Sequence, residues 1–232
     1  MLRRSLAAAL CSVLLALALA ACGGGSSDNG VSSKSPNGIA SAASGAVSKV
    51  NSVHVAGAVA NGSSRFTIDL NLVNGKGGSG QMSQGGLSFK IITVNNEVYI
   101  NGSPTFWRQF GGASAASLLS GKWLKAPASG QFASLATLTN VRQLFTQLLS
   151  THGKLAKGNG ATVRGHKVIA VNDKSNGGTL YVATTGKPYP IEIVKSGSNG
   201  GRVEFDRFNQ PVSLSPPANA IDVSKLSSSA GQ

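Results

Sequence analysis

SSRFTIDLNLVN, residues 63–74, is the stretch that decides the fold class of this chain. Within it Phe66, Ile68, Leu70 and Leu72 alternate with mostly polar residues, which is typical of a strand with one buried and one wet face. Similar short runs surround it, separated by Asn-Gly, Gly-Gly or Asn-Asn pairs that favour tight reversals. The pattern predicts an antiparallel meander with strands over residues 52–60, 63–74, 77–84, 87–94 and 96–100.

Alternation returns in the last third of the chain. Links rich in Gly, Asn and Pro separate the runs there, as sharp turns require. The strands predicted from this pattern cover residues 161–173, 178–184, 189–195 and 201–208. The residues expected to face inward are Leu180 with Val182, Ile191 with Ile193, and Val203 with Phe205. The ending PPANAIDVSKL, residues 216–226, is expected to pack Ile221, Val223 and Leu226 at the edge of a sheet or barrel.

Three segments have helical periodicity instead. Apolar residues recur at helical spacing over residues 39–50, and a shorter helix is expected over 132–138. In NVRQLFTQLLS, residues 140–150, the apolar positions form a full amphipathic stripe and Asn140 is a suitable N-cap. The order of helix, about five strands, two or three helices and about four strands predicts an α+β domain. Its long curved antiparallel sheet has an apolar face covered by helices inserted halfway along the chain.

The N-terminus has the features of an export signal. Arg3 and Arg4 precede residues 5–21, which contain no charged side chain and end in small residues. The run is short for a membrane span, and no basic flank follows it. LAAC, residues 19–22, resembles the bacterial lipobox, in which the cysteine is acylated and the signal is cut just before it. The alternative is an ordinary signal that leaves Cys22 as a free thiol.

This signal divides the chain into four expected parts. Residues 1–21 are the lipoprotein signal peptide, 22–35 the lipidated Cys22 with a flexible Gly/Ser tether, 36–226 a single domain and 227–232 a tail. Two or more acyl chains anchor a protein stably to a bilayer. We therefore expect the protein to be held by a lipid anchor on the extracytoplasmic face of the cell membrane. We also expect it to be a monomer.

Charge and cysteine content narrow the classes of partner. Loss of residues 1–21 removes two basic residues and no acid, so 19 Lys and Arg remain against 8 Asp and Glu, a net charge of +11. The basic residues are dispersed, which argues against a nucleic-acid partner. They form either a solvated surface or one attracted to anionic lipid head groups or an anionic cell-wall polymer. The domain contains no cysteine, which excludes disulfides and thiolate metal sites within one molecule.

No pattern of catalytic residues is present. His54, His152 and His166 are far apart in the sequence and show no metal-ligand spacing, so we expect each to be a surface histidine. The chain has no G-x-S-x-G elbow and no evident nucleophile with a base. The sequence therefore favours a protein that is not an enzyme and uses neither cofactor nor metal.

At family level the chain resembles the actinobacterial LppX/LprG lipoproteins and, more distantly, the LolA/LolB lipoprotein carriers. The shared features are the lipobox, the short tether, the strand meander ending in Val98–Ile100, the GKW element at 121–123 and the PPANAID ending at 216–222. The resemblance implies a half-barrel sheet closed by helices, with an apolar cavity between them that holds the acyl chains of a lipid or glycolipid.

Such a cavity would be lined by inward-facing apolar residues. The candidates are Phe66, Ile68, Leu70, Leu72, Phe89, Ile91, Val98, Ile100, Leu144, Phe145, Leu148, Leu180, Val182, Ile191 and Ile193. A sheet face and a helix stripe also pack to ordinary core density, so each is either cavity lining or plain core. The candidates for the cavity rim are Trp107, Trp123, Lys122 and Lys125, since indole rings suit an interface and lysines suit an anionic head group.

Three candidate functions follow. The first is a membrane-anchored protein that carries or presents a lipid or glycolipid. The second is a regulatory lipoprotein that resembles the RseB-type regulators, holds no lipid and binds a protein partner in the cell envelope. An extracytoplasmic hydrolase is a third, for which the sequence offers no catalytic set.

Overall fold

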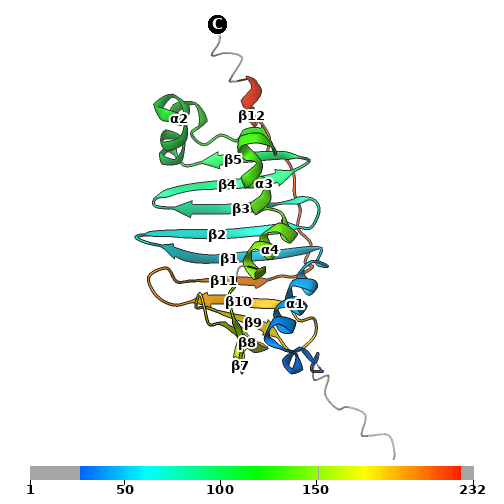
Figure 1. Cartoon of the computed structure of the whole chain (residues 1–232). Helices are drawn as coiled ribbons and strands as arrows, with labels where there is room; N and C mark the ends of the chain where they lie inside the picture. Colours follow the sequence, from blue (N-terminus) through cyan, green and yellow to red (C-terminus); the bar gives the residue numbers. More distant parts are fainter. Residues whose placement is uncertain (1–26, 151, 226–232) are drawn as a thin grey trace, which may run out of the picture.

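The computed structural model describes residues 27–150 and 152–225, and within them twelve strands form one curved, unclosed sheet (Figure 1). The strand order is β12-β6-β5-β4-β3-β2-β1-β11-β10-β9-β8-β7. Neighbouring strands are antiparallel except at the β12–β6 edge, which is parallel. The predicted α+β class with a curved antiparallel sheet is confirmed.

The first five strands form the predicted meander. They are β1 (Ser52–Asn61), β2 (Ser64–Val73), β3 (Gly77–Gln84), β4 (Leu87–Val94) and β5 (Glu97–Gly102). Asn95 and Asn96 connect the last two, with φ angles of 55° and 60°. Both central residues of a type I′ turn have positive φ, and asparagine tolerates this conformation well. The Asn-Asn pair therefore marked a true hairpin.

The remaining long strands are β7 (Leu155–Val163), β8 (His166–Asp173), β9 (Thr179–Ala183), β10 (Pro190–Lys195) and β11 (Gly201–Asp206). The prediction of one strand over 161–173 was wrong, because the chain reverses at Arg164 and Gly165, with φ angles of 50° and 80°. Arginine seldom adopts positive φ, so the pair did not look like a hairpin turn. β11 pairs with β1, which joins the two halves of the chain in the middle of the sheet.

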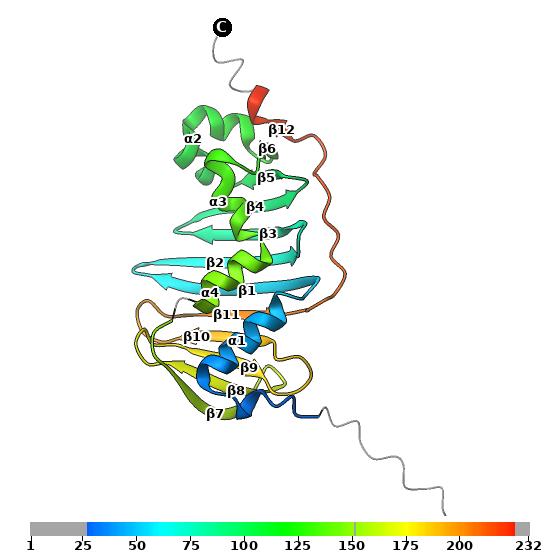
Figure 2. The same ribbon diagram turned by 45° about the vertical axis from the view of Figure 1, so that its right-hand side comes forward.

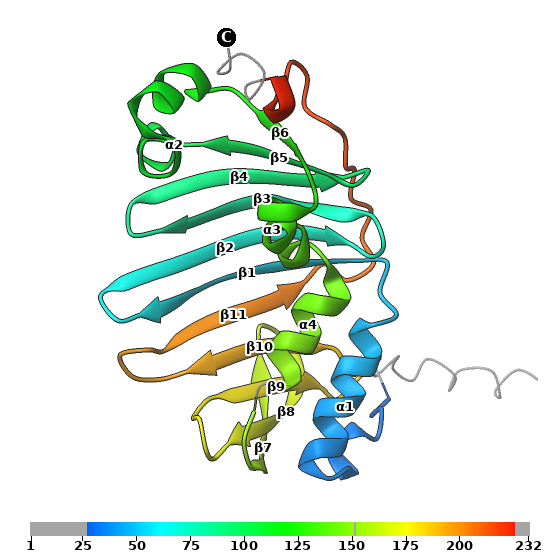
Figure 3. The same ribbon diagram turned by 45° about the horizontal axis from the view of Figure 1, so that its top comes forward.

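Helices cover one face of the sheet (Figures 2 and 3). They are α1 (Pro36–Val47), α3 (Ala133–Leu138) and α4 (Val141–Ser150), with short 3-10 turns η1 (Val31–Ser33) and η2 (Gly130–Phe132). As expected, Asn140 caps α4, since its Oδ1 accepts a hydrogen bond from the Gln143 backbone N–H at 3.1 Å.

Two elements of the structure were not predicted. Helix α2 (Pro104–Leu119) lies beside β4 and β5 and is kinked at Gly112, whose φ is 77°. Its run of glycine, alanine and serine, residues 111–117, weakens the apolar periodicity on which the prediction depended. Strand β6 (Leu124–Pro127) has only four residues, too few to show a clear alternation.

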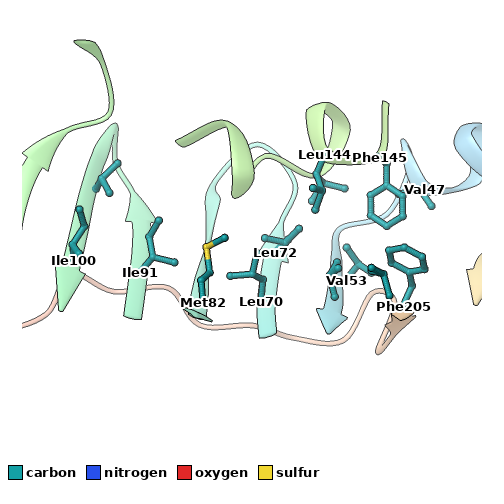
Figure 4. Close-up of a cluster of buried hydrophobic side chains, with 14 of the residues drawn as sticks. Val47, Val53, Leu70, Leu72, Met82, Ile91, Ile100, Leu144, Phe145 and Phe205 are labelled. Carbon is teal, nitrogen blue, oxygen red and sulfur yellow. The ribbon is translucent and has the colours of Figure 1, made fainter. Parts of the chain in front are cut away.

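The main core lies between the helices and the sheet (Figure 4). Side chains on the helix-facing side of the strands alternate with polar ones on the opposite face, so Leu70 and Leu72 are buried while Asp69 is exposed. Helix α4 contributes Val141 and Phe145, and α1 contributes Val47. A second cluster packs Val31, Ile39, Ala43, Ile169, Val171 and Val182 between the N-terminal segment, α1 and the β8–β9 part of the sheet.

Part of the segment predicted to be a flexible tether, residues 22–35, packs on the domain. The packed part begins at Asp28. Asp28 forms an isolated β-bridge with Thr185, Asn29 Nδ2 donates to Ala183 O at 3.0 Å, and Val31 is 1% exposed. The predictions for the signal peptide 1–21, for Cys22, for Leu226 and for the tail 227–232 fall outside the described residues.

A long segment runs from β11, in the middle of the sheet, to the edge formed by β6 and β12. Residues 209–220 run past the ends of the strands without regular secondary structure (Figures 1 and 2). The Asn209 N–H donates to Ser52 O at 2.9 Å, and the Ile221 N–H donates to Trp123 O at 2.7 Å. β12 (Ile221–Asp222) then pairs with β6, so Ile221 lies at a sheet edge as predicted. We call residues 209–220 the C-terminal strap.

Candidate functional site

An apolar hollow of about 140 Å³ lies between the sheet and helices α3 and α4. Among the residues that the structure describes, no polar side chain lines it. The lining residues are Gly57, Val59, Phe66, Ile68, Leu70, Met82, Leu138, Leu144, Leu148 and Val203. They come from β1, β2, β3 and β11 below and from the two helices above.

The hollow lies where β1 lacks a side chain. Val55, Gly57 and Val59 succeed one another on the helix-facing side of this strand, and the glycine leaves a gap between the two valines. A Cβ atom on Gly57 would lie 2.2 Å from the Arg202 backbone oxygen of β11, which is closer than real atoms approach. Close pairing of β1 with β11 therefore requires glycine here, and the missing side chain leaves space beneath α4.

A second hollow of about 130 Å³ lies on the other side of α4. Its apolar lining comes from α1, α4 and strands β7 to β10, and its polar lining includes His152, Asp173 and Lys195. Leu148 lines both hollows. This single side chain of α4 therefore stands between them.

A larger, half-polar cleft of about 750 Å³ lies at the hairpin ends of the strands. Its walls are the β2–β3 and β4–β5 turns, the α3–α4 joint and the strap. The polar and charged side chains in its lining are Lys76, Thr93, Asn95, Asn96, Thr139 and Asn140. Leu138 lines the apolar hollow while the next two residues line this cleft, so the α3–α4 joint separates the two spaces.

The sequence-predicted cavity residues fall into distinct groups. Those that line the apolar hollow are Phe66, Ile68, Leu70, Leu144 and Leu148. Leu148 also lines the second hollow, together with Leu180 and Ile193. Those buried in solid core without lining either hollow are Leu72, Ile91, Val98, Ile100, Phe145 and Val182. Phe89 packs against Phe106 of α2, with ring centroids 5.0 Å apart.

Ile191 lies on the opposite face of the sheet, which corrects the expectation that it points inward with Ile193. It packs with Val168 and Ala183 in a separate cluster. The pairing of β10 with β9 shifts between Pro190 and Glu192, which marks a β-bulge. A bulge places two successive residues opposite one, so the alternation changes phase there. Nothing in the sequence PIEIVK shows the change.

None of the four rim candidates lines either hollow. Trp107 is 5% exposed inside α2, and its indole N–H has no partner among the described residues. Trp123 is half-buried and Lys122 exposed, at the link from α2 to β6. The Lys125 ammonium lies 3.3 Å from Glu97 and 3.5 Å from Asp222, and the hydrogen bond and charge of Glu97 raise its pKa.

Sequence reasoning did not select Met82, Val59 or Leu138, all of which line the apolar hollow. One sequence signal could have located the hollow. Gly57 interrupts an alternating run of valines on the helix-facing side of β1. A glycine at an inward position leaves unfilled space or permits close backbone approach.

A polar network lies on the face opposite the helices. His54 is 9% exposed, with Nε2 2.9 Å from Asp69 Oδ1 and Nδ1 2.7 Å from Asp206 Oδ1. The expectation of a surface histidine is therefore wrong for His54, although His152 and His166 are exposed. Both ring nitrogens of His54 thus lie within hydrogen-bond distance of a carboxylate oxygen, which accepts hydrogen bonds.

Arg164 extends this network from the tip of the β7–β8 hairpin. Its guanidinium contacts Glu204, and its Nη2 donates to Asp206 Oδ2 at 2.8 Å. Burial raises the pKa of Asp206, but the hydrogen bond and charge of His54 and the charge of Arg164 outweigh it and lower that pKa. The network fastens β2, β1, β11 and the hairpin tip to one another. Within residues 27–150 and 152–225, no group of three His, Cys, Asp or Glu side chains is arranged to hold a metal.

Among the described residues, no helix combines the length and the apolar composition that crossing a bilayer requires.

Comparisons with known proteins bear on the fold. No protein-family model matches the chain, and no curated protein sequence matches it. Among solved structures, LprF from Mycobacterium bovis superposes with a TM-score of 0.53 at 14% identity, over 79% of this chain and 97% of LprF. The lipoprotein LppX from Mycobacterium tuberculosis superposes with a TM-score of 0.50 at 15% identity, over 82% of this chain and all of LppX. The curved sheet with its covering helices is therefore the fold of the mycobacterial lipoproteins LppX and LprF, as the sequence resemblance implied.

Proposed function

We propose that this protein is a membrane-anchored extracytoplasmic lipoprotein that binds a lipid or glycolipid and carries or presents it. The observation that carries the proposal is the hollow between the sheet and α3 and α4, to which the described residues contribute no polar side chain. Buried apolar surface of this kind stabilises acyl chains by about 0.8 kcal/mol per methylene. Acylation of Cys22 would keep the domain at the membrane from which the lipid comes.

The hollow must enlarge to take a whole acyl chain. Binding sites for ligands of drug size span about 300–1,000 Å³, whereas the two hollows on either side of α4 measure about 140 and 130 Å³. Because Leu148 lines both, an outward shift of α4 would merge them into one channel that is apolar at the α3 end. We propose this shift as the opening step.

The half-polar cleft offers a place for the other end of an amphiphile. It adjoins the apolar hollow across the α3–α4 joint, and its lining carries hydroxyl and amide groups with one cation, Lys76. A lipid with its chain under α4 would direct its head group toward this cleft.

The test is native mass spectrometry, with organic extraction, of residues 23–232 purified without detergent from a membrane-containing bacterial extract. We expect one bound lipid per protein. Leu148→Trp fills the space on both sides of α4 and should abolish the bound lipid. Leu118→Trp, the same change at a 43% exposed position of α2, should retain it. A lipid-free protein that takes up no lipid from vesicles would contradict the proposal.

The regulatory alternative has an observation of its own. Most of the helix–sheet interface is closed, and Leu72, Ile91 and Val98 show no exposure at all. A closely packed core of this kind suits a domain that binds a protein partner in the cell envelope. In that case the mass spectrum stays lipid-free and both tryptophan variants leave partner binding unchanged.

A further inference from the structure

The described chain begins at one end of the sheet, where it is fastened to the β8–β10 region (Figure 1). The Asn29 N–H donates to Thr184 O at 2.8 Å, and Asn29 Nδ2 donates to Ala183 O and Gly186 O at 3.0 and 3.1 Å. Val31 is buried in the cluster under α1. The position of residues 28–34 on the domain is therefore fixed by hydrogen bonds and by burial.

Four exposed lysines surround this segment, and we call them the lysine collar: Lys34, Lys157, Lys167 and Lys187. Lys34 directly follows η1. Lys157 Nζ donates to Ser32 O at 2.8 Å. The Lys167 carbonyl accepts from the Thr184 N–H, which places it one strand away from Asn29.

The positions of Lys167 and Lys187 relative to the fastened segment follow from their neighbours in the chain. Lys167 lies on the same face of β8 as Ile169, which packs against Val31. Lys187 directly follows Gly186, whose carbonyl accepts from Asn29. Within residues 28–34 the acidic side chain is that of Asp28. Its Oδ1 accepts a hydrogen bond from the Gly30 N–H at 2.6 Å. The collar is thus a concentration of positive charge where the chain reaches the domain.

We propose that the lysine collar is the surface with which this domain rests on an anionic lipid bilayer. Five residues, 23–27, separate Cys22 from Asp28, and an extended chain spans at most about 3.5 Å per residue, so the start of the fastened segment stays within about 21 Å of an acylated Cys22. The collar is then held near the head groups, where lysines are attracted to anionic lipids. The β2–β5 half of the sheet, on the far side of β1 and β11, points away from that bilayer.

The orientation rests on the proposed acylation of Cys22, but the affinity for anionic lipid does not. The test therefore uses residues 23–232, which have no acylation site and contain every residue that the structure describes. Binding is measured by cosedimentation with vesicles of phosphatidylcholine containing 30% phosphatidylglycerol, and with pure phosphatidylcholine vesicles, at 0.1 M salt. We expect binding to the first and little to the second.

Two triple variants with the same loss of charge separate the collar from the overall charge. Lys34→Gln/Lys167→Gln/Lys187→Gln should lower the partition coefficient about a hundredfold, since each lysine near an anionic surface contributes about fivefold. Arg65→Gln/Lys90→Gln/Arg108→Gln, at exposed positions of β2, β4 and α2, should lower it less than about fivefold. The three collar variants made singly should each lose about fivefold, which keeps the test valid if the triple variant melts early.

An equal loss in both triple variants would show that binding follows net charge alone and would overturn the proposal. So would a wild-type chain that ignores the anionic vesicles. The lipid content of the same samples is measured in parallel. A collar triple variant that releases vesicles yet keeps its lipid supports both proposals, whereas collar-dependent binding by a lipid-free protein supports the collar and contradicts the carrier.

Discussion

The ring of Phe145 in α4 lies 4.9 Å from the ring of Phe205 in β11, with the ring planes at 47°. Both residues are at most 2% exposed. The pair fastens the middle of α4 to a central strand, directly beside the apolar hollow. It therefore opposes the proposed outward shift of α4.

Removing the ring contact between Phe145 and Phe205 is expected to loosen α4. Phe145→Leu removes an aromatic pair worth about 0.5–1.5 kcal/mol beyond its buried area, and we expect a loss of about 1 kcal/mol in the free energy of unfolding. Urea titration measures the loss, and uptake of a fluorescent fatty acid should become faster. Phe110→Leu removes a similar ring contact, with Phe106 at 4.8 Å, but at a 68% exposed position of α2; it is the matched control and should change stability by less than about 0.5 kcal/mol. Equal effects of the two substitutions would show that the ring contact does not hold α4.

Gly57 is expected to tolerate no side chain. Gly57→Ala places a Cβ atom 2.2 Å from the Arg202 oxygen, so β1 and β11 must separate. We expect a loss of about 3 kcal/mol or more, in the range of severe packing defects. Gly45→Ala in α1 meets no atom within 4 Å and should stabilise the protein by about 0.5–1 kcal/mol. In thermal melts, we expect the melting temperature to fall for Gly57→Ala and to rise for Gly45→Ala. A Gly57→Ala protein as stable as the wild type would contradict the close strand pairing.

Arg164 is expected to hold the β7–β8 hairpin against β11. Arg164→Gln removes its contacts with Glu204 and Asp206, which are about one-quarter to one-third exposed. After allowance for solvent screening, we expect a loss of about 0.5–1 kcal/mol. Hydrogen exchange should accelerate in β7 and β8 while α4 is unaffected. Arg108→Gln, on the exposed side of α2, is the control, and similar exchange in the two variants would rule out an anchoring role.

Asp173 is expected to make the link after α4 sensitive to acid. Backbone N–H groups of Asn176, Gly153 and Ser175 donate to its carboxylate and lower its pKa to about 2, from 3.8. Because the folded pKa lies below the unfolded one, the stabilisation is fully present above about pH 4 and is lost as the pH falls through about 2. The amide proton shifts of the three donors should titrate together in this window. Asp173→Asn should abolish their common titration, and independent midpoints would contradict the shared carboxylate.

Much of the fold follows from local patterns in the sequence. Alternation and turn pairs placed β1 to β5 and β9 to β11 within a few residues, because each hairpin is specified by neighbours in the chain. The stripe of α4 and its Asn140 cap are local in the same sense. The Arg164-Gly165 turn and helix α2 were missed, because arginine rarely adopts positive φ and small residues leave little periodicity.

The candidate site was less predictable than the fold. The sequence identified inward-facing residues, but it did not separate Leu70, which lines the hollow, from Leu72 two positions later in solid core. It placed Ile191 on the wrong face, because a bulge reverses the alternation without changing the residue pattern. It also missed the burial of His54, whose two carboxylate partners lie on different strands.

The sequence by itself determined where most strands and helices begin and which faces of most strands are apolar, and it predicts an export signal with a lipobox before the domain. Only the tertiary structure decided that β1 pairs with β11, that Gly57 leaves a hollow under α4, and that the lysine collar gathers around residues 28–34. The physical reason is the range of the interactions. Hairpins and helices form between residues close in the chain, whereas these three features depend on contacts between segments far apart in the sequence.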